Sequence, residues 1–210
     1  MNKRNLLTLA LATAAIAACA TSPVDPRPAY SESDLRQMDA VHRRDFHPRG
    51  IAKMDRFDLD RVQRACNQYK DNPPEDLAKA LQAEQIGAIK FPQGELLGDW
   101  KKGQKIAQSG RGMTWSDKPG SANGGSCYNC HQLSPEEASY GTLGPSLKGF
   151  GKLRGNTSEI QKYTYGKIYN SKAYSVCSPM PRMGYSGTLT EEQIKDVVAY
   201  LLDPASPVNR

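Results

Sequence analysis

A chain of 210 residues can bury one good core, or one core and a smaller appendage. Its hydrophobic fraction of 38% is low for a protein whose interior is built from side chains alone. The net charge of +6 suits docking to an acidic partner protein. We expect no nucleic-acid partner, because neither a base-stacking aromatic motif nor a dense basic helix accompanies that charge.

The N-terminus has the layout of a secretory signal. Two basic residues precede a mostly apolar run over residues 6–18, and small residues follow. The run is too short for a membrane-spanning helix. We therefore expect residues 1–20 to direct export and the mature protein to be periplasmic. Cleavage after Ala20 would release a soluble protein, whereas the residues up to Cys19 also fit a lipobox, in which Cys19 is lipidated and becomes a membrane anchor.

Residues 21–94 are expected to form a flexible, Pro-rich start and a helical extension. Capping residues and the spacing of apolar residues together predict three helices. One begins at Ser31 or Ser33 and runs to about 46, one covers about 55–69, and one opens at Pro74. The third carries an apolar stripe of Leu77, Leu81, Ile86 and Ile89. Such an extension cannot bury its own stripe and must lie on another surface. His42 and His47 are interpreted as surface or packing residues.

Two further helices bracket a loop-rich, glycine-dense middle, and no strand pattern of convincing length is present. The first is predicted over about 95–108, where Gly103 would let another helix cross closely. The candidate partner is the last helix, over 190–202, which begins with a capping box of Thr190 and Gln193.

The middle contains a C-x-x-C-H run from Cys127 to His131. This spacing places two thiols one turn apart and an imidazole directly after them, as needed to bond both vinyl groups of a haem and ligate its iron. Incidental loop cysteines are a weaker interpretation, and a zinc site lacks its second pair of ligands. We predict one haem c attached to Cys127 and Cys130, with His131 as the proximal iron ligand. A buried porphyrin would also supply the missing apolar surface.

Cysteine counting then points to a disulfide. Of five cysteines, Cys19 belongs to the signal, while Cys127 and Cys130 are assigned to the haem. Cys66 and Cys177 remain, and in an oxidising compartment a leftover pair is most simply bonded. Two separate thiols are the alternative.

The order helix, haem turn, loops, helix predicts an all-α fold, with a class I cytochrome c domain over residues 95–205 behind the N-terminal extension. Class I cytochromes use a methionine well downstream of the haem turn as the second iron ligand. Met180 stands at that place between two prolines, and Met183 is its competitor. Pro145 resembles the proline whose carbonyl binds the proximal imidazole in that class. Arg182, beside the methionine, is a candidate partner for a haem propionate.

Several longer motifs resemble SoxX, the monohaem cytochrome subunit of the SoxAX complex of bacterial thiosulfate oxidation. The match covers roughly residues 60–208, includes Cys66 and Cys177, and is carried by the Met-Pro-Arg loop and by four segments, 110–117, 124–131, 140–147 and 162–170. The family usually has phenylalanine where this chain has Met183. This difference favours Met180 as the ligand and makes Met183 the alternative.

The resemblance implies a function in sulfur oxidation. SoxAX is an L-cysteine S-thiosulfotransferase that joins thiosulfate oxidatively to a cysteine of the carrier SoxYZ, and its substrate site belongs to the SoxA subunit. The expected partners are a SoxA-type dihaem or monohaem subunit, a SoxYZ-type carrier and a downstream soluble cytochrome. This chain would relay electrons through a His131/Met180 haem and have no catalytic site of its own. A stand-alone periplasmic electron carrier and a haem-based sensor are the other hypotheses.

Overall fold

The structure is a computed structural model that describes residues 27–210. These residues form helices and loops, and their only strand-like feature is one antiparallel bridge between Arg49 and Ala52. The all-α prediction is therefore confirmed. The expected export signal, including Cys19, lies outside the described residues. Within the described part, no helix has the length and apolar character to cross a bilayer.

The N-terminal extension begins as predicted and then departs from the prediction. Helix α2 (Glu32–Asp45) starts at Ser31, which forms a capping box with Asp34. The predicted helix over 55–69 is wrong in its first part. The chain there forms the short 3-10 turn η1 (Met54–Phe57) and then α3 (Arg61–Gln68), because Asp60 adopts an extended backbone and caps α3.

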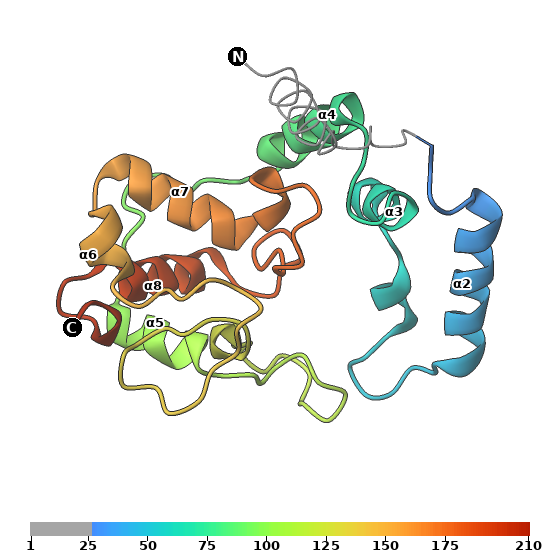
Figure 1. The fold of residues 1–210 in the computed structure, drawn as a ribbon. Helices are drawn as coiled ribbons and strands as arrows, with labels where there is room; N and C mark the ends of the chain where they lie inside the picture. The colour runs from blue at the N-terminus through green and yellow to red at the C-terminus, as the bar shows by residue number, and fades with distance from the viewer. Residues whose placement is uncertain (1–26) are drawn as a thin grey trace, which may run out of the picture.

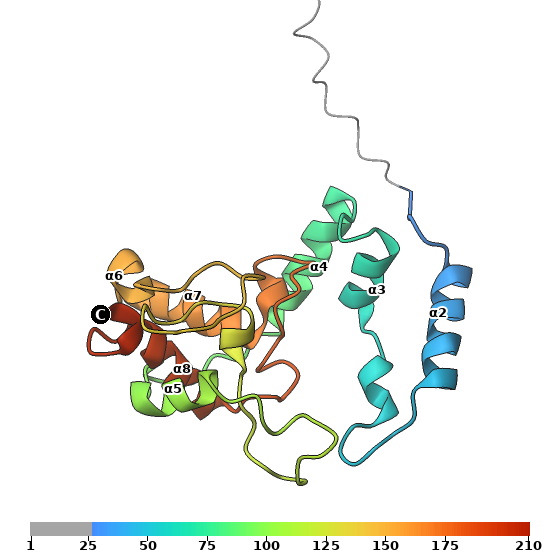
Figure 2. The same cartoon turned by 60° about the horizontal axis from the view of Figure 1, so that its bottom comes forward.

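The segment from α2 to η1 forms an arm set apart from the C-terminal half (Figures 1 and 2). Inside the arm, the His42 ring stacks on Phe57 with a centroid distance of 5.3 Å, so His42 is a packing residue as expected. The tip of the arm contacts the loop that contains Met113 and Trp115. There the Arg49 guanidinium lies 3.3 Å from the centre of the Trp115 ring, and Arg56 Nη1 donates to the carbonyl of Met113 at 2.8 Å.

Helix α4 (Glu75–Gly87) follows Pro74, which occupies the N-cap. Its predicted apolar stripe is only partly right. Leu81 is fully buried with Val62 and Cys66 of α3, but Ile86 is 54% exposed. The helix instead turns Gln85 inward, because it packs on η3 (Ser171–Ala173) and on the polar residues near it.

The C-terminal half surrounds helix α8 (Glu191–Leu202) (Figure 1). This helix contacts α5 (Trp100–Ala107), α6 (Phe150–Arg154), α7 (Ser158–Tyr169) and η4 (Pro207–Asn209). Its residues from Val197 to Leu202 are all buried. Their burial makes α8 the centre of the main core. The predicted capping box of Thr190 and Gln193 opens the helix.

The predicted close crossing of α5 and α8 is confirmed. A Cβ atom on Gly103 would overlap the Asp196 carbonyl and lie 2.8 Å from Tyr200 Cβ, so only glycine fits. Helix α5 is shorter than predicted, because residues 95–99 are not helical and Asp99 caps it at Lys101.

Helix α7 is absent from the sequence prediction, which placed a loop there. Its buried face consists of Thr164, Tyr165, Gly166 and Ile168. This mixture of polar, aromatic and small residues gives no apolar stripe to detect.

Candidate haem site

Cys127, Cys130 and His131 lie in one short turn. The backbone N–H groups of Cys130 and His131 both donate to the Cys127 carbonyl, at 3.1 and 3.0 Å. Ser126 leads into the turn η2 (Cys127–Asn129) with a left-handed φ of 51°. Both cysteines are free thiols, unlike Cys66 and Cys177. The turn therefore presents two thiols and an imidazole within a single chain reversal.

The Cys127 side chain packs against the main core. Burial raises the pKa of its thiol to about 11.

The imidazole of His131 has one nitrogen occupied. Its Nδ1 lies 2.7 Å from the carbonyl oxygen of Pro145. A carbonyl can only accept a hydrogen bond, so Nδ1 carries the proton and Nε2 offers its lone pair. Such a bond fixes the ring and makes it a stronger ligand. The expectation placed on Pro145 is confirmed.

Gly144 packs directly against the imidazole. A Cβ atom at this position would lie 2.7 Å from Nε2 of His131 and closer still to Cε1. Any side chain would therefore displace the ring from its bond to Pro145.

We expect Gly144→Ala to lower the free energy of unfolding of the haem-loaded protein by about 1–3 kcal/mol, as overpacking does. We also expect its reduction potential to change, because the ring of His131, the predicted iron ligand, moves. Thermal unfolding and redox titration would measure the two effects. Gly87→Ala is the matched control, since nothing lies within 4 Å of its Cβ position. Equal stability and potential in the two variants would contradict the packing argument.

The methionine loop lies beside the same core. Met180 and Met183 both pack against it, whereas Met113 is 42% exposed. The Met180 carbonyl accepts from Ser171 Oγ at 2.5 Å. Met183 N–H donates to Ile168 at 3.1 Å, which ties the loop to α7. Both candidate thioethers therefore adjoin the core that contains Cys127, while Met113 does not.

The sequence around this site is similar to that of known proteins. A profile of the cytochrome c family matches residues 100–203, from α5 to the end of α8. The chain belongs to the cytochrome c family. A protein of Aquifex aeolicus (strain VF5), described as an uncharacterized lipoprotein, is 40% identical over 155 residues, which is 72% of this chain and 73% of the relative.

A solved structure is also similar to this cytochrome c. It is the crystal structure of SoxXA from P. pantotrophus, with 26% identity over 56% of this chain and 89% of the other. The TM-score is 0.39, which does not establish a shared overall fold.

A cytochrome c carries covalently bound haem c and transfers electrons, and the residues present fit that group. Two free thiols and a histidine nitrogen with a free lone pair lie in one turn. The buried hydroxyls of Tyr165 and Tyr200 have no hydrogen-bond partner among the described residues. Such groups are costly unless a buried polar group or water meets them, and haem propionates are polar groups of this kind.

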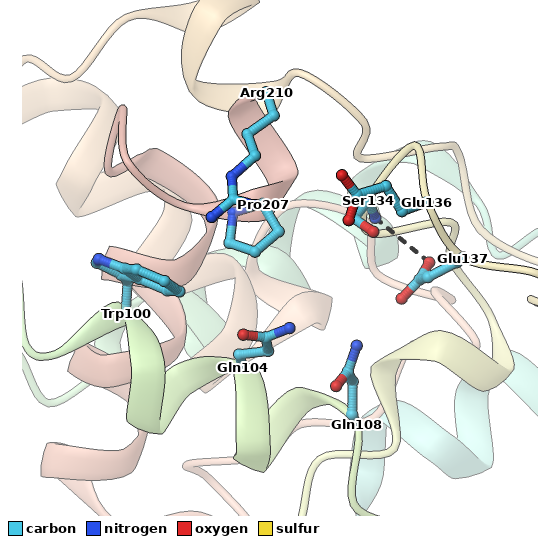
Figure 3. Close-up of a pocket in the computed structure, with 8 residues that line it drawn as sticks. All are labelled: Trp100, Gln104, Gln108, Ser134, Glu136, Glu137, Pro207 and Arg210. Carbon is cyan, nitrogen blue, oxygen red and sulfur yellow. Dashed lines mark hydrogen bonds between the residues drawn. The ribbon is translucent and has the colours of Figure 1, made fainter.

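Two other features of this cytochrome c are not the haem site. An open cleft of about 480 Å³ lies at the C-terminal end (Figure 3) and is lined by Trp100, Gln104, Gln108, Ser134, Glu136, Glu137, Pro207 and Arg210, so the haem turn does not contribute to it. The sulfurs of Cys66 and Cys177 lie near the Asp71 carboxylate. They are bonded to each other, however, and offer no thiolate to a metal.

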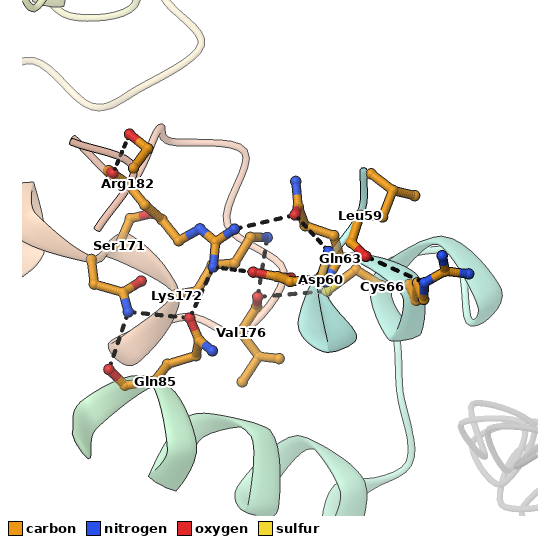
Figure 4. Close-up of polar contacts among 12 residues, drawn as sticks. Leu59, Asp60, Gln63, Cys66, Gln85, Ser171, Lys172, Val176 and Arg182 are labelled. Atoms are coloured by element: carbon orange, nitrogen blue, oxygen red, sulfur yellow. Dashed lines mark hydrogen bonds and ion pairs between the residues drawn. The ribbon is translucent and has the colours of Figure 1, made fainter. Parts of the chain in front are cut away.

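The structure gives Arg182 protein partners in the N-terminal extension. Its guanidinium pairs with Asp60 at 2.6 Å and also donates to Gln63 and Gln85 (Figure 4). Both Nη atoms of Arg182 are therefore engaged by the N-terminal extension. These three partners were not predicted from the sequence. The spacing of Asp60 and Gln63 is that of a capping box and could have indicated where α3 begins.

Proposed function

We propose that this cytochrome c is the electron-accepting subunit of a SoxAX-type L-cysteine S-thiosulfotransferase. The observation that carries the proposal is the set of long motifs that resemble SoxX. These motifs supply the haem turn, the carbonyl of Pro145 and the Met180 loop. The proposed complex would couple thiosulfate oxidatively to a cysteine of a SoxYZ-type carrier.

Four residues would hold the haem. Cys127 and Cys130 would form its thioether bonds, His131 would bind the iron on one side, and Met180 would bind it on the other. When bound, the haem supplies one-electron redox chemistry. Pro145 holds the His131 ring in the orientation that ligation requires. With His131 and Met180 both bound, the iron would have no position for a substrate, and the haem would serve electron transfer alone.

We propose no sulfur-transfer site in the described part of this chain. Cys66 and Cys177 form a disulfide, and Cys127 and Cys130 are assigned to the haem. The cysteine that reacts with thiosulfate would then belong to the SoxYZ-type carrier, and the substrate site to a SoxA-type subunit. A downstream soluble cytochrome would take the electrons away.

We further propose that the chain is exported to the periplasm. Haem attachment to a C-x-x-C-H run and a disulfide both suit an oxidising compartment. The relative from Aquifex aeolicus is described as a lipoprotein. That description supports lipidation of Cys19 over simple cleavage of residues 1–20. The extension (21–94) would then lie between the anchor and the haem domain (95–205).

The test is reconstitution with a SoxA-type subunit. The chain is expressed with the cytochrome c attachment machinery, and mass spectrometry is expected to find one haem and a lipidated Cys19. Mixed with a SoxA-type subunit, it is expected to form a heterodimer. With thiosulfate and a SoxYZ-type carrier, its haem is expected to be reduced as the carrier gains mass. A haem protein that stays monomeric in this mixture would instead be a stand-alone carrier.

A further inference from the structure

The segment that presents Met180 is attached at both ends to the N-terminal extension. We call residues 177–182 the ligand segment. Cys177, at its start, is bonded to Cys66 in the last turn of α3, with a Cα–Cα distance of 5.5 Å. Arg182, at its end, pairs with Asp60, the N-cap of α3. One helix outside the family-matched region therefore holds both ends of the ligand segment.

The guanidinium of Arg182 sits in a set of acceptors from two helices (Figure 4). Its side chain is only 11% exposed. Nη1 lies 2.6 Å from Asp60 Oδ2 and donates to Gln85 Oε1 at 3.1 Å, while Nη2 donates to Gln63 Oε1 at 3.2 Å. A charge this far from solvent requires such partners, so the position of the guanidinium is narrowly defined.

The acceptors are themselves fixed. Asp60 Oδ1 accepts from the N–H of Gln63 at 3.0 Å, and Gln63 Oε1 accepts from the N–H of Asp60 at 3.1 Å, which closes the capping box of α3. Gln85 is 2% exposed, and its Oε1 also accepts from Asn170 at 3.1 Å. None of the three can turn away from Arg182 without breaking a cap or a buried bond. The acceptors therefore form a preorganised socket.

Through this socket, the N-terminal extension restrains the segment that contains Met180. Between its two fixed ends, the ligand segment makes few other bonds that could hold Met180 in place. Ser171 Oγ donates to the Met180 carbonyl, and the Met180 N–H donates to Ser178 Oγ at 3.2 Å. These bonds are local to the loop and its neighbouring turn. The long-range restraints on residues 177–182 come from α3 and α4, and the bond from Met183 to Ile168 of α7 begins just beyond the segment.

We propose that Asp60 and Arg182 are positioning residues, which act as a clamp that keeps the Met180 thioether in place as an iron ligand. This inference rests on the proposed ligation of the iron by Met180. Without the pair, the C-terminal end of the segment loses its attachment to α3 and is held mainly by the Met183 N–H bond to Ile168. A form of the loop in which the Met180 thioether is away from the iron then becomes more populated. An external ligand binds this open form, so its apparent affinity reports that population.

The test uses the full-length ferric protein with its haem and imidazole as the external ligand. Asp60→Asn removes the charge but retains a good N-cap, so α3 stays capped. We expect it to bind imidazole at least about tenfold more tightly than the wild type. We also expect the Met-to-iron charge-transfer band to weaken. Arg182→Gln should behave alike, and the double variant should add little to either, because all three remove the same interaction.

The matched control is Glu84→Gln. It removes a different ion pair, which joins α3 to α4 and in which Arg61 Nη1 lies 2.8 Å from Glu84 Oε2. This pair is exposed and does not touch the ligand segment, so the control should bind imidazole as the wild type does. Thermal unfolding of each variant shows that binding is measured on folded protein.

Two outcomes would overturn the clamp, and they differ. If Asp60→Asn and Arg182→Gln keep the charge-transfer band and the wild-type imidazole affinity, the clamp is wrong and ligation by Met180 stands. If the wild type itself lacks the band and binds imidazole as tightly as Met180→Ala, the proposed ligation is wrong and the clamp falls with it.

Discussion

Met180→Ala is expected to convert the ferric haem from low-spin to high-spin, because an alanine cannot replace the thioether that we propose as an iron ligand. The Met-to-iron charge-transfer band should disappear, and the ferrous protein should bind carbon monoxide at neutral pH. The reduction potential should fall, since methionine ligation raises it. Axial ligands span roughly 0.8 V of haem potential, so a large shift is expected. Absorption spectra and redox titration would measure it.

Met183→Ala is the matched control, because Met183 packs against the same core and stands on the same loop. Its spectrum should remain low-spin, with the charge-transfer band intact. A high-spin Met183→Ala together with an unchanged Met180→Ala would move the ligand assignment to Met183.

Removing the disulfide is expected to have the largest effect on stability. Cys66 and Cys177 are separated by 111 residues. In the chain-entropy model, a cross-link that closes a loop of about 100 residues contributes roughly 4.7 kcal/mol. The Cys66→Ser/Cys177→Ser double variant should therefore unfold more easily by up to about that amount. Because each kcal/mol shifts the melting temperature by about 2–4 °C at this chain length, a fall of up to roughly 10–20 °C is expected.

Denaturant titration of the loaded protein would measure the loss. Wild-type protein treated with a reductant should reproduce the double variant, which separates the cross-link from the effect of the serines. Imidazole affinity should also rise, because the ligand segment loses its other fixed end. A double variant as stable as the wild type would show that α3 stays docked through its polar contacts alone.

The parts of the site that are contiguous in sequence were predictable. The haem turn occupies consecutive residues, so its spacing alone predicts two thiols and a ligand. The caps at Ser31 and Thr190 were predictable for the same reason, since a capping box joins residues only three apart. The close crossing at Gly103 followed from one glycine in an apolar helix face.

The contacts that join distant segments were not predictable. Asp60 and Arg182 are far apart in the chain, and each alone has the properties of an ordinary surface charge. Only the tertiary structure shows that Gln85 of α4, and not Ile86, faces the interior of the protein. Helix α7 escaped prediction because tyrosine and threonine make its buried face.

The long separation of the disulfide has a consequence for biogenesis. An exported chain emerges from its N-terminus, so Cys66 meets Cys127 and Cys130 before Cys177 arrives. Oxidation in order of emergence would pair the wrong sulfurs, and thiol–disulfide exchange must undo that pairing before the porphyrin can be joined to the chain. The yield of mature cytochrome is therefore expected to depend on a thiol isomerase in the host cell as much as on the supply of haem.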